Sequence, residues 1–177
     1  MQTFLITGAA GFIGSHLADK LLNEGNKVIV VDNFCDFYNP EIKENNVKHN
    51  LSNPNYKLYR ADIRDRNELA KVFNENKIDV VIHLAAMAGV RPSIDNPIYY
   101  QEVNCMGTQN ILEEMKAHNA KNIVMNYINA RDEFNRLIST EKGFAAFNII
   151  MNMGYDGQLS SIYSPTSDDT LELLTIV

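Results

Sequence analysis

The sequence predicts a doubly wound α/β fold, with a mainly parallel sheet and helices on both of its faces. Two observations predict it: short apolar runs rich in β-branched residues alternate with segments of helical periodicity, and spaced glycines separate the first run from the first such segment. The 177 residues, 45% of them hydrophobic, suffice for the core of one domain. We therefore expect one compact unit.

The first two strands and the helix between them are predicted within residues 1–32. Residues 4–7 form an apolar run, and from Phe12 onward apolar side chains recur at helical spacing as far as Gly25, a residue type that often follows a helix end. Residues 27–32 are almost uninterruptedly apolar, as expected of a strand that helices cover on both faces. This pattern indicates a strand, a crossover helix and a second strand.

The middle of the chain continues the alternation after a polar stretch. Residues 33–55 are rich in Asn and hold only a weak helical candidate at 41–49, so we predict a loop with a partial helix. Residues 56–62 are predicted as a third strand, and a helix around Leu69 follows it. Residues 78–86, with a continuous apolar centre, are predicted as the fourth strand.

A loop is expected after the fourth strand, then a long helix at 97–118 and a fifth strand at 121–125. Because the sequence becomes more acidic after this strand, we assign residues 1–125 to the core of the domain. Residues 126–177 are predicted to be a divergent C-terminal segment that packs on the same domain.

Three stretches of the C-terminal segment have recognisable patterns. Residues 131–140 favour a helix, 144–153 either an apolar strand or a buried helix, and 171–177 a terminal strand or a short helix. Their order on the sheet does not follow from the sequence.

Composition excludes several classes of protein. The formal net charge is -6 and Lys and Arg form no stripe, so nucleic acid is not expected as a partner. The N-terminus lacks a basic lead with an apolar core, and no apolar run is long enough to cross a bilayer, so we expect a soluble, cytoplasmic protein without a membrane partner. Cys35 and Cys105 belong to no Cys/His cluster, which predicts free thiols and no metal site.

The glycines after the first strand form the strongest chemical motif. Gly8, Gly11 and Gly14 lie in a G-x-x-G-x-x-G pattern at the predicted strand-to-helix junction, where a tight turn and a helix N-terminus can hold a pyrophosphate. Asp32 ends the next strand, where a carboxylate accepts hydrogen bonds from both ribose hydroxyls and repels a 2′-phosphate. The pattern favours NAD over NADP; the alternative is that the glycines only make a turn and Asp32 only caps a loop.

Five segments together carry a family resemblance: "TGAAGFIGSHLADKLL", "VVDNF", "RADIRD", "VIHLAAMAGVRPS" and "NPIYYQEVNCMGTQNILE". In this order they resemble the extended short-chain dehydrogenase/reductase family with its Rossmann-like fold, and within it the NAD-dependent nucleotide-sugar epimerases and dehydratases. "AGVRPS" is most similar to the UDP-glucuronate 4-epimerase branch. The resemblance covers residues 1 to about 124.

The resemblance implies a set of cofactor-binding residues. The pyrophosphate would be contacted by Gly8, Gly11, Phe12, Ile13 and Gly14, and the adenosine ribose by Asp32 and Asn33. The adenine would be contacted by Asp62 and Ile63. The cofactor beside the fourth strand would be lined by Leu84, Ala85, Ala86 and Ala88, and its nicotinamide end would lie near Asn104. The strand-end positions among them agree with the rule that ligands bind beyond the carboxyl ends of parallel strands. For the "LAA" stretch, close helix packing is the alternative.

Substrate residues are predicted in the loop after the fourth strand. The resemblance places a UDP-sugar near Arg91 and Ser93, and Arg can hold a carboxylate or phosphate through two parallel hydrogen bonds. A solvated loop arginine is the alternative. His83, inside an apolar strand, is interpreted as a core histidine, and the aromatic pair Tyr99 and Tyr100 as packing residues.

The catalytic residues of the resembling family do not appear in this sequence. That family pairs a Tyr with a Lys four residues later, so that the ammonium lowers the pKa of the phenol that takes the sugar hydroxyl proton. None of the 8 tyrosines here is followed by Lys at that spacing. The nearest substitutes are Tyr127 with Arg131 and the stretch "SSIY" at 160–163. We name no catalytic residue.

Two functional hypotheses follow. The first is an NAD-binding member of the epimerase family, similar to UDP-glucuronate or UDP-glucose 4-epimerases, with hydride transfer at C4 of the sugar. The second is a non-catalytic NAD-binding module, or a truncated or chimeric epimerase without the Tyr–Lys couple. The resemblance also implies a homo-oligomer, and a sheet edge left uncovered after the fifth strand would favour self-association too.

Overall fold

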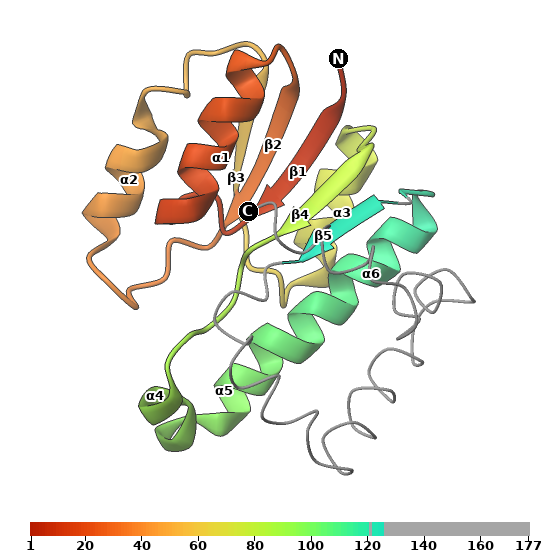
Figure 1. The fold of residues 1–177 in the computed structure, drawn as a ribbon. Coiled ribbons are helices and arrows are strands. Elements are labelled where there is room, and N and C mark those ends of the chain that lie inside the picture. The colour runs from red at the N-terminus through yellow and green to blue at the C-terminus, as the bar shows by residue number, and fades with distance from the viewer. Residues whose placement is uncertain (121, 126–177) are drawn as a thin grey trace, which may run out of the picture. The chain divides into compact units, whose positions relative to one another are not determined.

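A parallel sheet with the strand order β3-β2-β1-β4-β5 forms the centre of the described part of the chain (Figure 1). The computed structural model describes residues 1–120 and 122–125. The strands are β1 Thr3–Thr7, β2 Lys27–Asp32, β3 Tyr56–Arg60, β4 Val80–His83 and β5 Asn122–Met125. The order starts at β1 and winds outward in both directions, which confirms the doubly wound fold.

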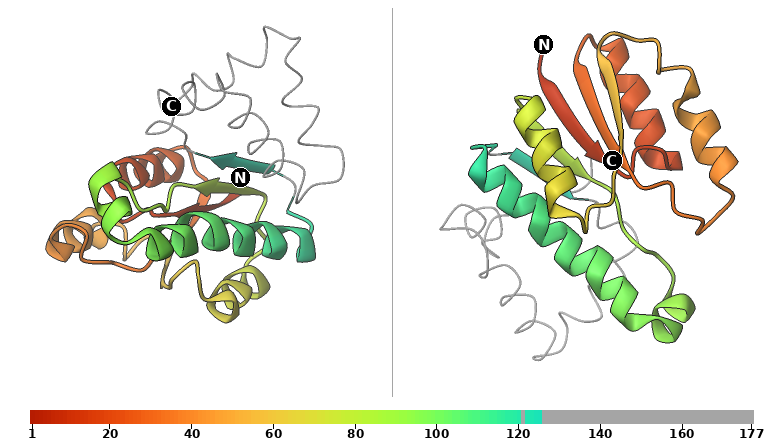
Figure 2. Two further views of the ribbon diagram at one scale, coloured as in Figure 1. Left: turned by 90° about the horizontal axis from the view of Figure 1, so that it is seen from below. Right: turned by 180° about the vertical axis from the view of Figure 1, so that it is seen from behind.

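Helices cover both faces of the sheet, as the two further views show (Figure 2). One face carries α1 and α2, and the other carries α3 and a long helical segment that leads into β5. The helices are α1 Phe12–Asn23, α2 Pro40–Lys48, α3 Arg66–Glu75, α4 Val90–Asp95, α5 Pro97–Gln101, the π-helical turn η1 Glu102–Gly107, and α6 Thr108–Ala117.

Alternate side chains of each central strand pack into two separate apolar cores. Leu5 and Ile29 contribute to the core under α3 and α6, whereas the next residues along the strands, Ile6 and Val30, contribute to the core under α1. All four side chains have no exposed surface. This explains the unbroken apolar runs, because both faces of these strands are buried.

N-cap residues determine where helices α2 and α3 begin. Asp65 caps α3, where its carboxylate accepts the backbone N–H groups of Asn67 and Glu68 at 2.9 and 3.2 Å. Asn39 caps α2 by accepting the N–H of Glu41 at 3.0 Å. The partial helix predicted at 41–49 is thus confirmed as α2.

Two predicted strands are shorter in the structure. The fourth strand was expected over 78–86 but pairs with β1 only from Val80 to His83, because β1 itself ends at Thr7, the partner of His83. The third strand was expected over 56–62 and ends at Arg60, opposite the last residue of β2. In each case the length of the neighbouring strand sets the boundary.

The loop predicted after the fourth strand contains a short helix, α4. Backbone hydrogen bonds close it, from Ser93 N to the carbonyl of Gly89 at 3.3 Å and from Asn96 N to that of Pro92 at 3.0 Å. Pro92 lies in the first turn, where its missing N–H is no loss. The prediction that Arg91 and Ser93 lie in a loop is therefore wrong.

The long helix predicted at 97–118 is present but not uniform. It consists of α5, the π-helical turn η1 and α6, and the π turn inserts an extra residue into the helical ladder. Gly107 ends this turn against Ile63, whose Cδ1 would lie 2.6 Å from a Cβ at position 107. The helical stretches predicted in 131–140 and beyond lie outside the described residues.

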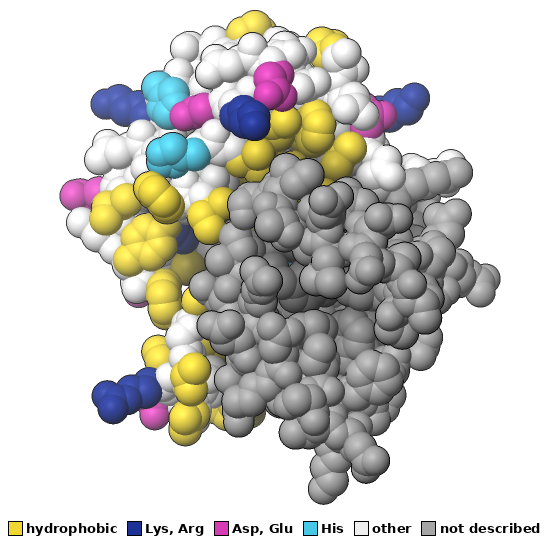
Figure 3. All heavy atoms as spheres, in the orientation of Figure 1, with side chains coloured by type: hydrophobic (Ala, Val, Ile, Leu, Met, Phe, Trp, Pro, Cys, Tyr) yellow, Lys and Arg dark blue, Asp and Glu magenta, His cyan; other side chains and the backbone are white. Residues whose placement is uncertain are grey.

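No helix among the described residues has the length and apolar character needed to cross a bilayer. Exposed apolar side chains nevertheless occur on α4 and the start of α5, at Val90, Ile94 and Ile98, each more than two thirds exposed. Figure 3 shows apolar side chains next to a basic one in this region, at the lower left.

Candidate functional site

The predicted site residues converge because four parallel strands end at one edge of the sheet. Thr7 at the end of β1 pairs with Val31 on one side and with His83 on the other, and Asp32 at the end of β2 pairs with Arg60. The segments that follow these strands therefore lie side by side beyond the carboxyl edge (Figure 1). They contain all of the predicted cofactor positions except Asp32, the last residue of β2, and Asn104, which lies in η1.

The glycine turn packs directly on the end of β4. Gly8 has a φ of +73°, and a Cβ there would lie 2.7 Å from the backbone N of Ala85. A Cβ at Gly14 would lie 2.6 Å from the Cα of Ala9. Both contacts are with backbone atoms, which cannot rotate away, so these two positions require glycine for the turn and for the close approach of α1.

The N-terminus of α1 is left without a side-chain cap. Gly11 is the N-cap residue and provides no acceptor for the first-turn N–H groups. Phe12 and Ile13 follow it with side chains 75% and 39% exposed. This arrangement gives an anionic group access to N–H donors at the positive end of the helix dipole, with apolar side chains beside it.

Asp32 is almost fully buried and held by three partners. Its Oδ2 accepts the N–H of Ala10 at 3.0 Å, and its Oδ1 accepts the N–H of Phe34 at 2.9 Å. The Nζ of Lys43 lies 3.4 Å from the same Oδ1. These contacts fix the carboxylate at the end of β2, directly beside the glycine turn.

Lys43 is a member of the site that sequence reasoning missed. Its side chain is 7% exposed, and its Nζ also lies 3.4 Å from Sγ of Cys35. Burial lowers the pKa of Lys43, but the Asp32 carboxylate and the Cys35 thiol raise it by more, so it lies above its ordinary value. The available signal was a lysine on the inner face of a weak amphipathic helix, since Lys43 and the buried Val47 are four residues apart.

A series of hydrogen bonds connects the end of β4 to β1 and to the long helix. Thr108 donates its hydroxyl to the carbonyl of Asn104, so Nε2 of His83 donates to Thr108 Oγ1, at 2.9 Å. Nδ1 then accepts from Thr7 Oγ1 at 2.6 Å, and Thr7 Oγ1 accepts the N–H of Ala85 at 3.2 Å. Burial lowers the pKa of His83 to about 4, so this ring is neutral at pH 7, and its prediction as a core histidine is confirmed.

The segment after β4 is fixed from the long helix. The side-chain amide of Asn104 accepts the N–H of Met87 at 2.7 Å and donates to the carbonyl of Met87 at 2.9 Å. The hydroxyl of Tyr100 donates to the carbonyl of Ala88 at 2.6 Å. Leu84, Ala85 and Ala88 are half-buried, and Ala86 is exposed at the edge.

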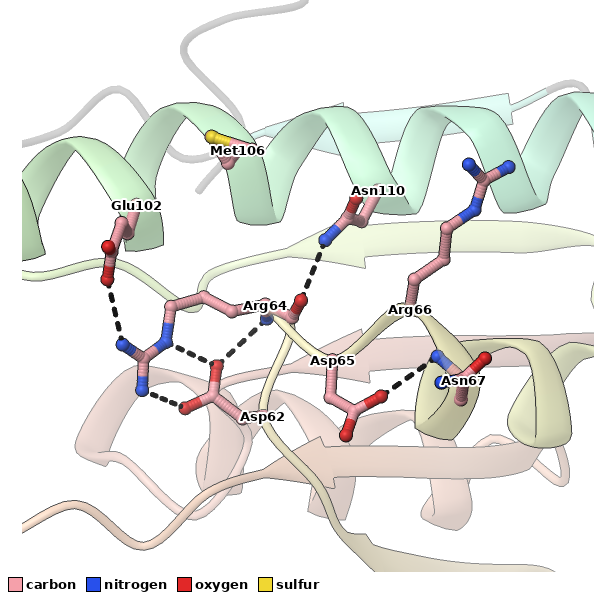
Figure 4. A pocket seen from close by; sticks show the side chains of 8 residues that line it. All are labelled: Asp62, Arg64, Asp65, Arg66, Asn67, Glu102, Met106 and Asn110. Carbon is pink, nitrogen blue, oxygen red and sulfur yellow. Dashed lines mark hydrogen bonds and ion pairs between the residues drawn. The ribbon is translucent and has the colours of Figure 1, made fainter.

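Asn33, Asp62 and Ile63 meet beyond β2 and β3. The amide Nδ2 of Asn33 donates to Oδ2 of Asp62 at 3.0 Å, which joins the predicted ribose and adenine positions. Burial raises the pKa of Asp62, but hydrogen bonds from Arg64 and Asn33 bring it down to about 2. Beside this carboxylate lies a pocket of about 590 Å³ between the β3–α3 segment and the long helix (Figure 4).

The two predicted substrate residues lie on α4, away from these contacts. Arg91 is exposed, and the Ser93 hydroxyl donates to the carbonyl of Val90 at 2.6 Å, within its own helix. Among the described residues, no group of three or more His, Cys, Asp and Glu side chains is placed to hold a metal ion.

Comparison with known proteins places this geometry in a family. The family model for GDP-mannose 4,6-dehydratase matches residues 5–134. The chain belongs to this family of NAD-dependent epimerases and dehydratases. The Rossmann-like core described above is therefore the nucleotide-binding fold of that family, as the resemblance implied.

The relatives with similar sequences include a nucleotide-sugar enzyme. The UDP-glucuronate 4-epimerase of Thermodesulfobacterium geofontis is 42% identical over 125 residues, 71% of this chain and 39% of the relative. Protein CapI of Staphylococcus aureus is 43% identical over 120 residues, 68% of this chain and 36% of the relative. The chain thus spans little more than a third of the length of these relatives.

A solved structure agrees with the fold. The UDP-glucose 4-epimerase of Bifidobacterium longum, in complex with NAD⁺ and UDP, superimposes with a TM-score of 0.58 at 38% identity, covering 71% of this chain and 36% of that one. The similarity is therefore to about a third of an epimerase that was solved in complex with NAD⁺ and UDP.

Proposed function

We propose that this chain binds NAD at the carboxyl edge of its sheet, as the nucleotide-binding part of a nucleotide-sugar epimerase or dehydratase. The observation that supports this most directly is the glycine turn. A Cβ at Gly8 or Gly14 would lie within 2.7 Å of backbone atoms, so the turn packs against the segment after β4 and α1 packs against the turn, with the N-terminus of α1 left without a side-chain cap. This is the geometry that a pyrophosphate requires.

The remaining contacts order the dinucleotide along the edge. The pyrophosphate lies at Gly11, Phe12 and Ile13, and the adenosine ribose lies at Asp32. The adenine extends toward Asp62 and Ile63 beyond β3, and the nicotinamide extends toward the end of β4. Each assignment is part of the proposal and rests on the order of the strand ends, β3-β2-β1-β4.

The carboxylate of Asp32 favours NAD over NADP. The backbone N–H groups of Ala10 and Phe34 hold its two oxygens in place. A 2′-phosphate on the ribose would bring a second negative charge next to this fixed carboxylate, whereas a 2′-hydroxyl donates to it.

The substrate side lies at the β4 end, toward α4. We propose a UDP-sugar, either UDP-glucuronate or UDP-glucose, with the exposed guanidinium of Arg91 in reach of a carboxylate or phosphate. NAD, when bound, supplies the hydride acceptor for oxidation of C4 of the sugar. The chain's own described residues orient that cofactor through the turn, Asp32 and the backbone after β4.

A second candidate function is NAD binding without catalysis. It is favoured by one observation on the sequence: no tyrosine is followed by a lysine four residues later. Under this hypothesis the chain binds the dinucleotide and any sugar chemistry is carried out elsewhere.

Calorimetric titration of the 177-residue chain with NAD and, in parallel, with NADP tests the proposal. The purified protein is first checked for cofactor carried through purification. We expect saturable binding of NAD and at least tenfold weaker binding of NADP, which corresponds to about 1.4 kcal/mol. A folded, cofactor-free chain that binds neither dinucleotide would overturn the proposal, and equal affinities would refute the role of Asp32.

A further inference from the structure

Cys35 and Lys43 bring a thiol and an amine together at the end of β2. Cys35 lies in the segment that joins β2 to α2, and Lys43 lies on α2 (Figure 1). Nζ of Lys43 is 3.4 Å from Sγ of Cys35. The side chain of Lys43 is 7% exposed, whereas Cys35 is half-buried, so small solutes reach the pair from the sulfur side. The pair is therefore a buried amine held against an accessible thiol.

Contacts outside the pair keep the two side chains close. The backbone N–H of Cys35 donates to Oδ1 of Asn33 at 3.0 Å, which fixes the turn that carries the thiol. On α2, Nδ2 of Asn46 donates to the carbonyl of Ala10 in the glycine turn at 2.9 Å, which docks the helix that carries Lys43. The approach of nitrogen to sulfur is thus set by the fold around them.

The ammonium of Lys43 is shared between Cys35 and two other groups. Its Nζ lies 3.4 Å from Oδ1 of Asp32 and 5.2 Å from the ring centroid of Tyr38. Of the three groups that face the ammonium, the thiol is the one that peroxide oxidises readily. Because the nitrogen is shared, a reaction that joins it to the sulfur also removes the positive charge beside Asp32.

We propose that hydrogen peroxide converts Cys35 and Lys43 into a reversible covalent cross-link, and that this cross-link weakens NAD binding by removing the positive charge beside Asp32. The part that concerns NAD rests on the proposed function, whereas the cross-link does not. The pair is a modification site that responds to an oxidant.

The chemistry takes place in two steps. Peroxide first oxidises the thiol to a sulfenic acid, in which an S–O bond forms, the O–O bond breaks and one water leaves. The nitrogen of Lys43 then attacks this sulfur, so an N–S bond forms and the S–O bond breaks. The leaving hydroxyl takes one proton of the ammonium to become water, and a second proton passes to solvent. Overall the sulfur loses two electrons and the peroxide becomes two waters.

The product is a sulfenamide, whose nitrogen carries no charge. Its formation leaves the site more negative by one charge, next to a dinucleotide whose pyrophosphate is anionic. A dithiol reductant such as dithiothreitol supplies the two electrons and, with one proton from solvent, restores the thiol and the ammonium while it becomes a disulfide. The cross-link is therefore reversible.

Peptide mapping of the full chain after treatment with hydrogen peroxide tests for the cross-link. Chymotrypsin, used without reductant, cuts after Phe37 and Tyr38, between the two residues. We expect the peptide with Cys35 to be joined to the peptide with Lys43, at a mass lower by two hydrogens than their sum, and to separate after dithiothreitol. Cys105, an exposed thiol on η1, is the internal comparison and is expected in no pair with a lysine peptide.

Lys43→Arg separates oxidation of the thiol from formation of the cross-link. Arginine keeps a positive charge beside the sulfur but is not an amine nucleophile, so we expect a sulfenic acid that dimedone traps and no joined peptides. Lys48→Arg is the matched control, because it makes the same exchange at an exposed lysine of the same helix and is expected to cross-link as the wild-type chain does. The urea midpoint of each variant is measured, and folded variants are compared.

Calorimetric titration with NAD before and after peroxide tests the effect on the cofactor. We expect the cross-linked chain to bind NAD about fivefold more weakly, as one added negative charge at a partly screened distance predicts, and dithiothreitol to restore the affinity. Peroxide is expected to leave the affinity of Cys35→Ser unchanged, since this variant has no thiol at the site.

The possible results separate the cross-link, its effect and the proposed function. Absence of joined peptides in the wild-type chain, or their presence in Lys43→Arg, would overturn the cross-link. A cross-linked chain that binds NAD as tightly as the reduced chain would overturn its effect on the cofactor. A reduced chain that binds no NAD would overturn the proposed function and that effect with it, while the peptide map would still decide the cross-link.

Discussion

At the scale of single residues, position 8 requires glycine for two reasons, a left-handed backbone conformation and a close backbone contact, and substitutions can separate them. Its φ is +73°, and a Cβ would lie 2.7 Å from the backbone N of Ala85. Gly25 also has a left-handed conformation, with a φ of +81°, but a Cβ there would have no atom within 4 Å. Gly8→Ala therefore adds a backbone clash to the cost of a left-handed conformation.

We expect Gly25→Ala to lower the free energy of unfolding by about 1 kcal/mol, the cost of the left-handed conformation. Gly8→Ala is expected to lower it by about 3 kcal/mol, because displacing backbone typically costs a further 1–3 kcal/mol or so. Urea unfolding of both variants measures the difference. Equal destabilisation would show that the end of β4 can move away from the turn.

The sequence predicted the site residues that belong to regular motifs and missed those that depend on the tertiary structure. The glycines and Asp32 follow from spacing around strand ends. Lys43 did not, because a lysine on a short polar helix is exposed in most proteins and only its packing against Asp32 shows otherwise. Arg64 lies within the quoted motif "RADIRD", but its guanidinium hydrogen bonds to Asp62 from a position that Glu102 on the long helix also holds.

At the scale of elements, the side chain of His83 links two strands and a helix through hydrogen bonds. It lies on β4 and hydrogen bonds to Thr7 on β1 and Thr108 on α6. Its pKa is lowered to about 4 in the folded chain by burial, below the ordinary value of 6.5. Between these two values the unfolded chain binds a proton at this residue that the folded chain does not, so acid favours unfolding.

We expect the contribution of His83 to stability to be complete above its unfolded pKa and to decline as the pH falls toward about 4. Going from about pH 7.5 to about pH 5, it should lower the free energy of unfolding by about 2 kcal/mol. Urea unfolding at both pH values, compared with His83→Gln, isolates this contribution. The glutamine amide keeps a donor and an acceptor for the two threonines and does not titrate in this range, so an unchanged pH dependence in the variant would contradict the assignment.

Element types followed from the periodicity more reliably than element boundaries did. All five strands of the described residues were predicted, because buried parallel strands are apolar on both faces. The ends of β3 and β4 were not, since each is set by where its neighbour stops pairing. The short α4 was missed because Gly89 and Pro92 signal a loop, although a proline in a first helical turn is well tolerated.

At the scale of the whole molecule, the described core holds every predicted cofactor residue and no predicted catalytic pair. The chain is similar to Protein CapI and to a UDP-glucuronate 4-epimerase, and it spans 36% and 39% of their lengths. Under the proposed function the carboxyl edge of this sheet binds the dinucleotide, and the candidate bases for the sugar's proton, Tyr127 and Tyr163, follow the fifth strand in the sequence. Cofactor binding and sugar chemistry are therefore separable properties, and each needs its own assay.

We expect the 177-residue chain to bind NAD and to leave UDP-glucose and UDP-glucuronate unchanged. Epimerisation at C4 needs a base for the sugar hydroxyl proton, and none of the 8 tyrosines has a lysine four residues later to lower its pKa. Chromatography of each UDP-sugar after prolonged incubation with the NAD-saturated chain measures conversion, with the epimerase of Bifidobacterium longum as the positive control.

Formation of either C4 epimer would contradict this expectation and would require another base in the chain. The two candidates that the sequence offers are Tyr127, with Arg131 four residues later, and Tyr163, which ends "SSIY". Arginine stays protonated and can stabilise a phenolate, so Tyr127→Phe would abolish turnover under the first alternative, and Tyr163→Phe would abolish it under the second. Because neither substitution changes a residue of the proposed cofactor site, NAD affinity should be the same in both variants, which distinguishes a lost base from a lost cofactor.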